Sequence, residues 1–155
     1  MKKPDFYGVG PRIGRIVLPF WAVTIALTFI FPSVFKFPAG CKTCTLWSGI
    51  IFLALALVLY GITVRNLVSG LKEGRLVTTG AFRYCQNPLY AVLLLLVIPG
   101  VGLLLNSWLV LTTPVVGYIA FKKYIGGEYE KLKELFGDEY LDYQKRTPEF
   151  FPFIK

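Results

Sequence analysis

Two long apolar runs, residues 13–34 and 46–67, constrain the fold most strongly, because neither contains an acidic residue. A helix that crosses the roughly 30 Å hydrocarbon core of a bilayer needs about 20 apolar residues, so each run is long enough to span a membrane. Shorter apolar runs follow at residues 89–105 and 108–124, separated only by residues 106–107. This spacing predicts that the third and fourth runs form a tight helical hairpin.

The predicted fold is therefore an all-α integral membrane protein with four transmembrane helices and cytoplasmic amphipathic helices in a C-terminal tail, residues 125–155. Hydrophobic residues make up 55% of the chain, and residues 1–155 leave room for one membrane domain. Pro99 and Pro114 are expected to interrupt the third and fourth helices, since proline lacks a backbone N–H. The first run is too long for a cleavable signal peptide, so we expect it to remain in the mature protein.

The tail carries an amphipathic pattern that predicts a helix ending at Gly137. Asp138 is suited to cap a second short helix. The apolar face of the first helix holds Tyr129, Leu132, Leu135 and Phe136. Such a tail either lies on the membrane surface or folds back over the ends of the spans as a lid, and the sequence leaves both arrangements open.

Basic residues predict the orientation, because Lys and Arg in short loops stay on the cytoplasmic side. Of 17 Lys and Arg residues, only Lys36 and Lys42 fall between the first two runs. Both termini are therefore predicted to be cytoplasmic. The net charge of +8 is assigned to topology and to anionic lipid headgroups rather than to nucleic acid. The expected partners are the bilayer and a lipid or lipidated substrate, and the oligomeric state is left open.

Cysteine and histidine usage limits the chemistry. Cys41 and Cys44 form a C-x-x-C in the predicted outer loop, where a disulfide staple is favoured over a redox centre. Cys85 lies on the other side and is expected to be an unpaired thiol. The chain has no histidine, which removes the usual general base and the common metal ligand, so no metal site is predicted. Chemistry supplied by a bound cosubstrate remains.

Two motifs carry a resemblance to a known family. Residues 71–80 and the following Asn87-Pro88-Leu89-Tyr90 resemble the signature before the third helix of small membrane methyltransferases. These include the isoprenylcysteine carboxyl methyltransferases and the phosphatidylethanolamine N-methyltransferases. The second motif is similar to the C-terminal pattern of the same group and comprises Glu128, Leu132, Phe136-Gly137, Tyr140, Tyr143 and Pro148.

The resemblance implies S-adenosylmethionine as cosubstrate, S-adenosylhomocysteine as product and a lipophilic acceptor that enters from the bilayer. The acceptor is an isoprenylcysteine-type carboxylate or a phospholipid amine, attacking the sulfonium methyl in line, a step that depends mainly on proximity and orientation. Two departures leave the acceptor open. Gln86-Asn87-Pro88 stands where many isoprenylcysteine relatives carry Arg-His-Pro, and Tyr129 replaces the second residue of an acidic pair.

The resemblance also implies site residues, with Glu128 and Arg83 as the catalytic pair. The implied cosubstrate-binding residues are Gly61, Arg83, Tyr84, Asn87, Pro88, Tyr90, Glu128 and Tyr129. A purely structural role is also open for these residues, as three of them illustrate. Asn87 is expected first to cap the helix that Pro88 begins, and Arg83 serves equally as a positive-inside residue. Glu128 also suits a solvated pair with Lys131.

Two alternative functions fit parts of the pattern. Membrane sterol-type reductases have a related C-terminal signature and would use NADPH, although they are usually much larger. A non-catalytic membrane protein would instead use the outer Cys41 and Cys44 loop. Whether the protein prefers a nicotinamide cofactor or S-adenosylmethionine distinguishes the first alternative from a methyltransferase. Full activity after substitution of both cysteines by serine would argue against the second alternative.

Overall fold

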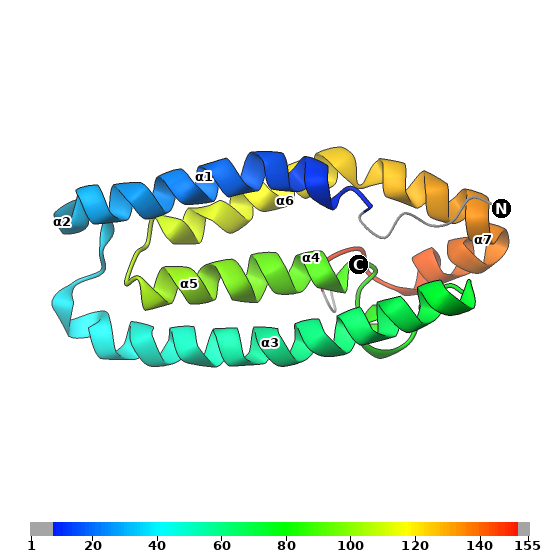
Figure 1. Cartoon of the computed structure of the whole chain (residues 1–155), viewed down its shortest axis with the longest axis horizontal. Coiled ribbons are helices and arrows are strands. Elements are labelled where there is room, and N and C mark those ends of the chain that lie inside the picture. The colour runs from blue at the N-terminus through cyan, green and yellow to red at the C-terminus, as the bar shows by residue number, and fades with distance from the viewer. Residues whose placement is uncertain (1–7, 152–155) are drawn as a thin grey trace.

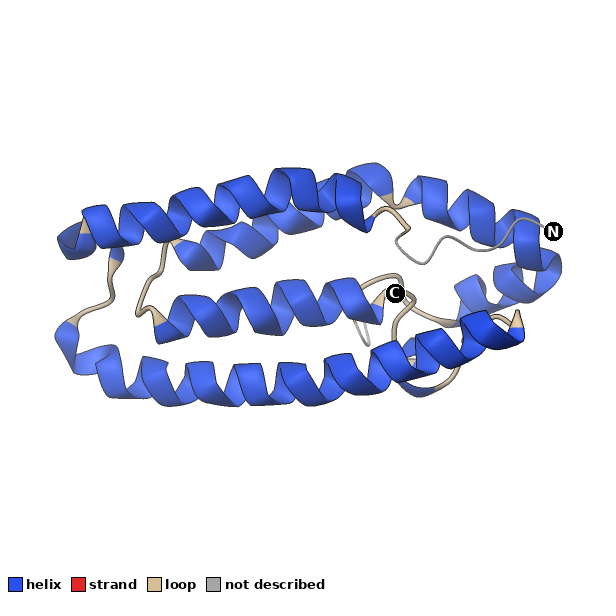
Figure 2. Cartoon of the chain, viewed as in Figure 1, coloured by secondary structure: helices blue, strands red, loops and turns tan. Residues whose placement is uncertain are grey.

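The computed structural model describes residues 8–151, which form helices joined by short loops (Figures 1 and 2). No strand occurs within this range, apart from one isolated bridge between Lys36 and Ser107. The prediction of an all-α fold is confirmed. The α-helices are α1 (Gly10–Ile30), α2 (Pro32–Phe35), α3 (Lys42–Glu73), α4 (Pro88–Val92), α5 (Ile98–Leu104), α6 (Thr113–Tyr124) and α7 (Gly126–Arg146). Short 3-10 turns lie at Ala39–Cys41, Gly80–Arg83 and Val110–Thr112, and a π turn at Leu93–Val97 joins α4 to α5.

Two helices are long and apolar enough to cross a membrane: α1, and α3 with the 3-10 turn before it, Ala39–Glu73. α3 extends well beyond the predicted 46–67 and ends at Gly74 in a left-handed conformation, φ 66°. The third apolar run folds as one shorter apolar helix, Pro88–Leu104. These two long helices indicate a membrane protein, and the four-span topology remains a prediction.

The two prolines behave differently. Pro99 lies in the first turn of α5, directly after the π turn, so the regular α-helical hydrogen-bond pattern is broken there as the sequence predicts. Pro114 lies in the first turn of α6, where a backbone N–H has no partner within the helix. The expected interruption at Pro114 is wrong, because this proline begins the regular helix instead of breaking it.

Helices pack in two long pairs, α3 against α5 and α1 against α6 (Figure 1). Small residues allow the first pair to approach closely. A Cβ atom at Gly49 would lie 2.9 Å from the carbonyl oxygen of Gly100, and one at Gly100 would lie 2.8 Å from Leu53 Cδ2. Glycine at these positions therefore permits backbone contact, which is typical of helix packing in membranes.

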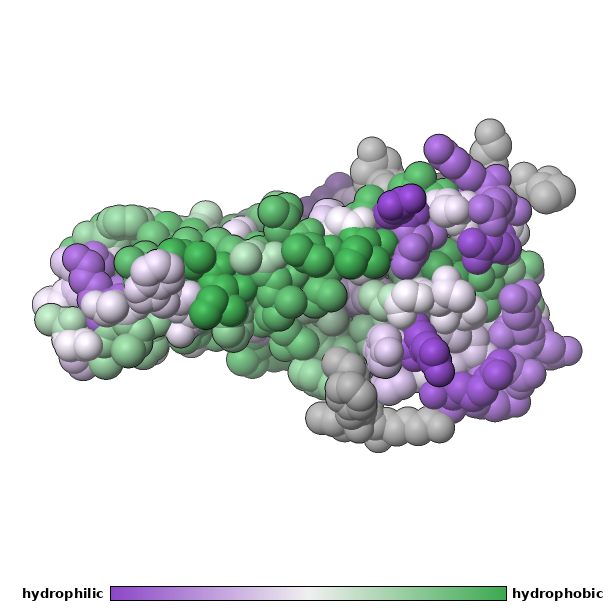
Figure 3. Space-filling model, turned by 90° about the horizontal axis from the view of Figure 1, so that it is seen from below, coloured by the Kyte–Doolittle hydropathy of each residue, from purple (hydrophilic) through white to green (hydrophobic). Residues whose placement is uncertain are grey.

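Apolar side chains dominate the outer surface of the bundle. Leu57 on α3 is 75% exposed, and Val23 on α1 and Ile51 on α3 are more than half exposed. Hydrophilic residues gather at the α7 end and, less densely, at the opposite tip (Figure 3). A large exposed apolar band between polar ends is the surface expected of a protein that contacts lipid. We call the α7 end, with the first turn of α1 and the last turns of α3 and α6, the basic end, and the tip with α2 and residues 105–109 the loop end.

The tail folds back onto the basic end. Gly137 has φ 53° and ψ −127°, so α7 consists of two helical parts joined by a kink at the predicted position. The Tyr143 hydroxyl donates a 2.6 Å hydrogen bond to the Phe82 carbonyl, and the Gln86 N–H donates to the Pro148 carbonyl at 2.8 Å. Of the two arrangements that the sequence left open, the structure therefore has the lid.

Candidate functional site

A cavity of about 100 Å³ lies at the basic end, where α7 covers the turns before α4. It brings together three segments of the chain: residues 67–77, residues 82–87 and residues 128–143. Asn87 and Tyr129, from the second and third of these, are separated by 42 positions. Most of its wall is apolar, with polar groups at a few points, which is the usual composition of a ligand site. Its lining residues are Leu67, Leu71, Arg75, Leu76, Val77, Phe82, Gln86, Asn87, Glu128, Tyr129, Leu132, Phe136, Tyr140 and Tyr143.

Asn87 occupies the position before α4, but its side chain does not cap the helix. Its Nδ2 donates instead to Tyr129 Oη at 2.7 Å and to the Glu149 carbonyl at 2.9 Å. The expectation that capping takes precedence is therefore wrong. The buried amide is drawn away from the helix start because the tail supplies two acceptors that would otherwise be unpaired.

Glu149 joins this hydrogen-bond network from the C-terminal segment. Tyr129 Oη donates to Glu149 Oε1 at 3.2 Å, and Lys122 Nζ lies 2.5 Å from Glu149 Oε2. Burial raises the pKa of the Tyr129 phenol, and the nearby Glu149 carboxylate raises it further, so this hydroxyl remains protonated at neutral pH. Asn87, Tyr129 and Glu149 form what we call the closure network, which holds the tail over the cavity.

Glu128 links the cavity to the start of α1. Its Oε2 accepts a 3.2 Å hydrogen bond from the Val9 N–H, the residue immediately before α1. Gly8 has φ 47°, and a Cβ there would lie only 2.5 Å from the same oxygen. Burial raises the pKa of the Glu128 carboxyl, while the Val9 N–H and Lys131 act in the opposite direction. A negative charge at the positive end of a helix macrodipole is electrostatically favourable.

Two of the residues that line the cavity each carry a buried polar atom that has no hydrogen-bond partner within residues 8–151: Tyr140 Oη and Gln86 Oε1. Tyr140 is only 2% exposed. The Gln86 amide is fixed because its Nε2 donates to the Thr147 carbonyl at 2.6 Å, which leaves the oxygen on the other side. Buried polar groups are usually paired, so two lining residues with an unpaired donor and an unpaired acceptor make this cavity the candidate site for a polar ligand. A third such atom, Trp21 Nε1, belongs to α1 and does not line this cavity.

Aromatic rings stand beside the acidic group. The Tyr129 and Tyr140 ring centroids are 6.4 Å apart, and the Tyr140 and Tyr143 centroids are also 6.4 Å apart. A tyrosine wall next to the Glu128 carboxyl favours a ligand that carries positive charge, through cation–π attraction of roughly 0.5–2 kcal/mol.

Three of the predicted site residues, Asn87, Glu128 and Tyr129, meet in the cavity. The other five are not among the residues that line it. Gly61, Arg83 and Tyr84 are exposed, Pro88 is buried in the first turn of α4, and Tyr90 packs against Phe121.

Cys85 is buried and free, and burial raises the pKa of its thiol to about 11. It is therefore protonated at neutral pH and unsuited to nucleophilic chemistry. Cys41 and Cys44, near the start of α3, are exposed and are also free, so the disulfide staple that the sequence favours is not formed in the structure.

The sequence predicts neither Gln86 nor Glu149 as a site residue, and Tyr140 enters only as part of a motif. Gln86 departs from a family pattern, and its position as a polar residue beside Asn87 is the available signal. Nothing in the sequence pairs Glu149 with Lys122 and Tyr129, because that contact depends on where the tail returns.

No protein-family model matches the chain. The protein-S-isoprenylcysteine O-methyltransferases of Mus musculus and Rattus norvegicus are each 34% identical over 90 residues, covering 52% of this chain and 28% of theirs. The cobalt-zinc-cadmium resistance protein CzcN of Cupriavidus metallidurans is 36% identical over 86 residues, covering 55% of this chain and 39% of its own. The chain thus spans well under half the length of these relatives. It is distantly related, over about half its length, to protein-S-isoprenylcysteine O-methyltransferases.

Proposed function

We propose that this protein is an S-adenosylmethionine-dependent methyltransferase that modifies a lipophilic acceptor in the membrane. The observation that carries the proposal is the cavity at the basic end, where the two family-like motifs meet and the Tyr140 hydroxyl and Gln86 carbonyl are buried without partners. The distant relationship to isoprenylcysteine O-methyltransferases supports the same activity.

The lining residues fit the proposed cosubstrate chemically. When bound, S-adenosylmethionine supplies an activated methyl group on a positively charged sulfur. Glu128 would offer a carboxylate to a cationic group, and Tyr129 and Tyr140 would offer ring faces. Tyr140 Oη would donate to a ligand acceptor, and Gln86 Oε1 would accept from a ligand donor.

The closure network would control access. A cavity of about 100 Å³ is small beside the ~300–1000 Å³ of typical ligand pockets. A nucleoside-sized ligand therefore requires α7 and the tail to move away, which separates Asn87 and Tyr129 from Glu149. When the tail returns it excludes water from the site, which protects an activated methyl donor from hydrolysis.

The acceptor would be an isoprenylcysteine-type carboxylate or a phospholipid amine. A carboxylate is ionised at neutral pH and needs no base, which suits a chain without histidine. An amine must first lose a proton, for which Glu128 is the candidate base because burial raises its pKa. The proposal includes the predicted topology of four spans with both termini cytoplasmic, which places the basic end at the cytoplasmic headgroups.

The test is calorimetric titration of the detergent-solubilised protein with S-adenosylhomocysteine, with NADPH as the comparison. We expect micromolar affinity for the sulfur nucleoside and none for NADPH. Transfer of a radiolabelled methyl group to a prenylcysteine or to a phosphatidylethanolamine would then identify the acceptor. Binding of NADPH alone, or of neither ligand by protein with its full helical content, would overturn the proposal.

Substitutions at Glu128 and Arg83 test whether the ligand contacts the cavity alone or also the 3-10 turn that contains Arg83. Glu128→Gln keeps an oxygen for the Val9 N–H but removes the charge, so we expect weaker binding of S-adenosylhomocysteine. Arg83 is exposed and does not line the cavity in its closed form. Loss of affinity in Arg83→Ala as well would mean that the 3-10 turn Gly80–Arg83 closes onto the ligand, whereas unchanged affinity would restrict the site to the cavity.

A further inference from the structure

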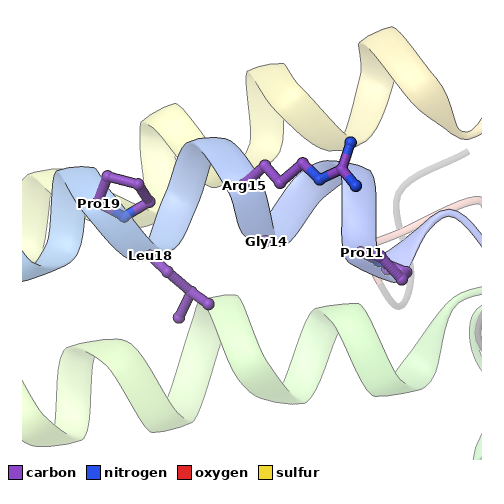
Figure 4. A pocket seen from close by; sticks show the side chains of 6 residues that line it. Pro11, Gly14, Arg15, Leu18 and Pro19 are labelled. Atoms are coloured by element: carbon purple, nitrogen blue, oxygen red, sulfur yellow. The ribbon is translucent and has the colours of Figure 1, made fainter.

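A shallow, open depression, which we call the groove, lies on one face of α1, away from the cavity under α7 (Figure 4). All of its lining residues belong to this one helix: Gly10, Pro11, Gly14, Arg15, Leu18 and Pro19. Gly14 leaves space here: among the described residues, a Cβ at this position would meet only Leu18 Cδ1, at 3.8 Å. Leu18 is 60% exposed, so the floor of this groove is an apolar surface without cover from the described part of the chain.

The groove has one charged edge and one apolar edge. Arg15 is exposed, and its side chain runs along α1 toward the first turn of the helix, that is, toward the basic end (Figure 4). Leu18 and Pro19 lie one turn further along, within the apolar band of the bundle. Within residues 8–151, no acidic residue lines the groove. A long basic side chain that reaches from apolar surface toward headgroup level is the usual behaviour of arginine at a membrane interface.

We propose that this groove binds one anionic phospholipid, with the phosphate at Arg15 and an acyl chain along Gly14, Leu18 and Pro19. The arginine head is a strong partner for phosphate, and the apolar floor suits a hydrocarbon chain. A second copy of the chain fits less well. A symmetric contact through Gly10 and Gly14 would bring Arg15 near the same residue of the other copy, and like charges repel.

The experiment is native mass spectrometry of the full-length protein in detergent, with equal concentrations of phosphatidylglycerol and phosphatidylcholine. Phosphatidylglycerol carries neither a carboxylate nor an amine, so its retention does not depend on the proposed methyl-transfer activity. We expect one retained lipid per chain and a preference of roughly fivefold for the anionic lipid, which corresponds to about 1 kcal/mol for one basic residue at a membrane surface.

Three variants test the assignment. Arg15→Gln should abolish the preference, and Gly14→Leu should fill the groove and reduce retention of both lipids. Arg12→Gln is the matched control: it removes an exposed charge from the first turn of α1 that does not line the groove, and it should keep the preference. Circular dichroism should show unchanged helicity, since leucine favours helix more than glycine does.

Three results would overturn the proposal. Equal loss of preference in Arg12→Gln and Arg15→Gln would show diffuse surface charge instead of a site. Full retention of both lipids in Gly14→Leu would place them elsewhere. A dimer that Gly14→Leu converts to monomer would make a second copy the occupant.

Discussion

The loop end and the basic end of the bundle differ in how fully their buried polar groups are paired. At the loop end, Thr28 Oγ1 and Ser107 Oγ lie 2.7 Å apart, and Thr45 donates to Asn106 Oδ1 at 2.8 Å. Asn106 also donates to the Phe37 carbonyl at 3.0 Å. At the basic end, the Tyr140 hydroxyl is as deeply buried but has no partner within residues 8–151.

This difference distinguishes polar groups that hold the helices together from polar groups that are available to a ligand. A hydrogen bond between helices in an apolar environment fixes their register, so polar groups that are paired inside the protein are structural. A buried group left unpaired costs about 1–3 kcal/mol, a cost that a ligand can remove. The pairing at the loop end thus fits a structural role, and the unpaired Tyr140 hydroxyl fits the ligand site that we propose at the basic end.

We expect the largest effect on stability from a substitution that disrupts the close packing between α3 and α5. Gly49→Ala places a methyl group 2.9 Å from the backbone oxygen of Gly100, which must shift, so we expect a loss of about 1–3 kcal/mol in unfolding free energy. Gly61→Ala on the same helix meets no atom within 4 Å and should instead stabilise α3 by about 0.5–1 kcal/mol. Unfolding in mixed detergent micelles, followed by circular dichroism, measures both, and equal effects would contradict the packing.

The matched pair Tyr140→Phe and Tyr143→Phe compares an unpaired hydroxyl with a paired one. Tyr140→Phe should leave stability unchanged or raise it, while S-adenosylhomocysteine binding weakens about tenfold, or ~1.4 kcal/mol. Tyr143→Phe removes the bond to the Phe82 carbonyl and should cost about 1 kcal/mol of stability. Calorimetry and thermal unfolding measure the two quantities, and a destabilised Tyr140→Phe protein with intact binding would make that hydroxyl structural.

The raised pKa of Glu128 predicts that the stability of the ligand-free protein depends on pH. Its pKa is raised above the ordinary value of 4.5, chiefly by burial, so folding favours the protonated carboxyl. Its contribution to stability is full below pH 4.5 and is lost as the pH rises through the folded-state pKa. The Tm of the wild-type protein should therefore fall relative to that of Glu128→Gln as the pH rises from 4.5 to 7. A constant difference in Tm across this range would contradict the burial of the charge.

The smallest effect is expected at the loop end. Thr28→Val removes the side-chain contact with Ser107, and hydrogen bonds between membrane helices are worth about 0.6 kcal/mol on average. Ser107 keeps a 3.3 Å hydrogen bond from the Val110 N–H, which limits the loss. Calorimetry should show unchanged affinity for S-adenosylhomocysteine. A change of more than threefold would contradict the claim that the loop end does not contribute to binding at the basic end.

The sequence by itself determined the apolar helices, the kink at Gly137 and the motifs that contain Asn87, Glu128 and Tyr129. These features depend on local composition, helical periodicity and the conformational freedom of glycine, which neighbouring residues largely set.

Only the tertiary structure decided how the basic end is closed. The sequence predicted that Asn87 caps its own helix, but the returning tail supplies Tyr129 and Glu149 as acceptors across 42 and 62 positions. Partners so distant follow from the path of the whole chain, because a side chain takes the hydrogen bonds that burial leaves available rather than those that local sequence suggests. For the same reason, only the tertiary structure shows that Gln86 Oε1 and Tyr140 Oη are buried without a partner within residues 8–151.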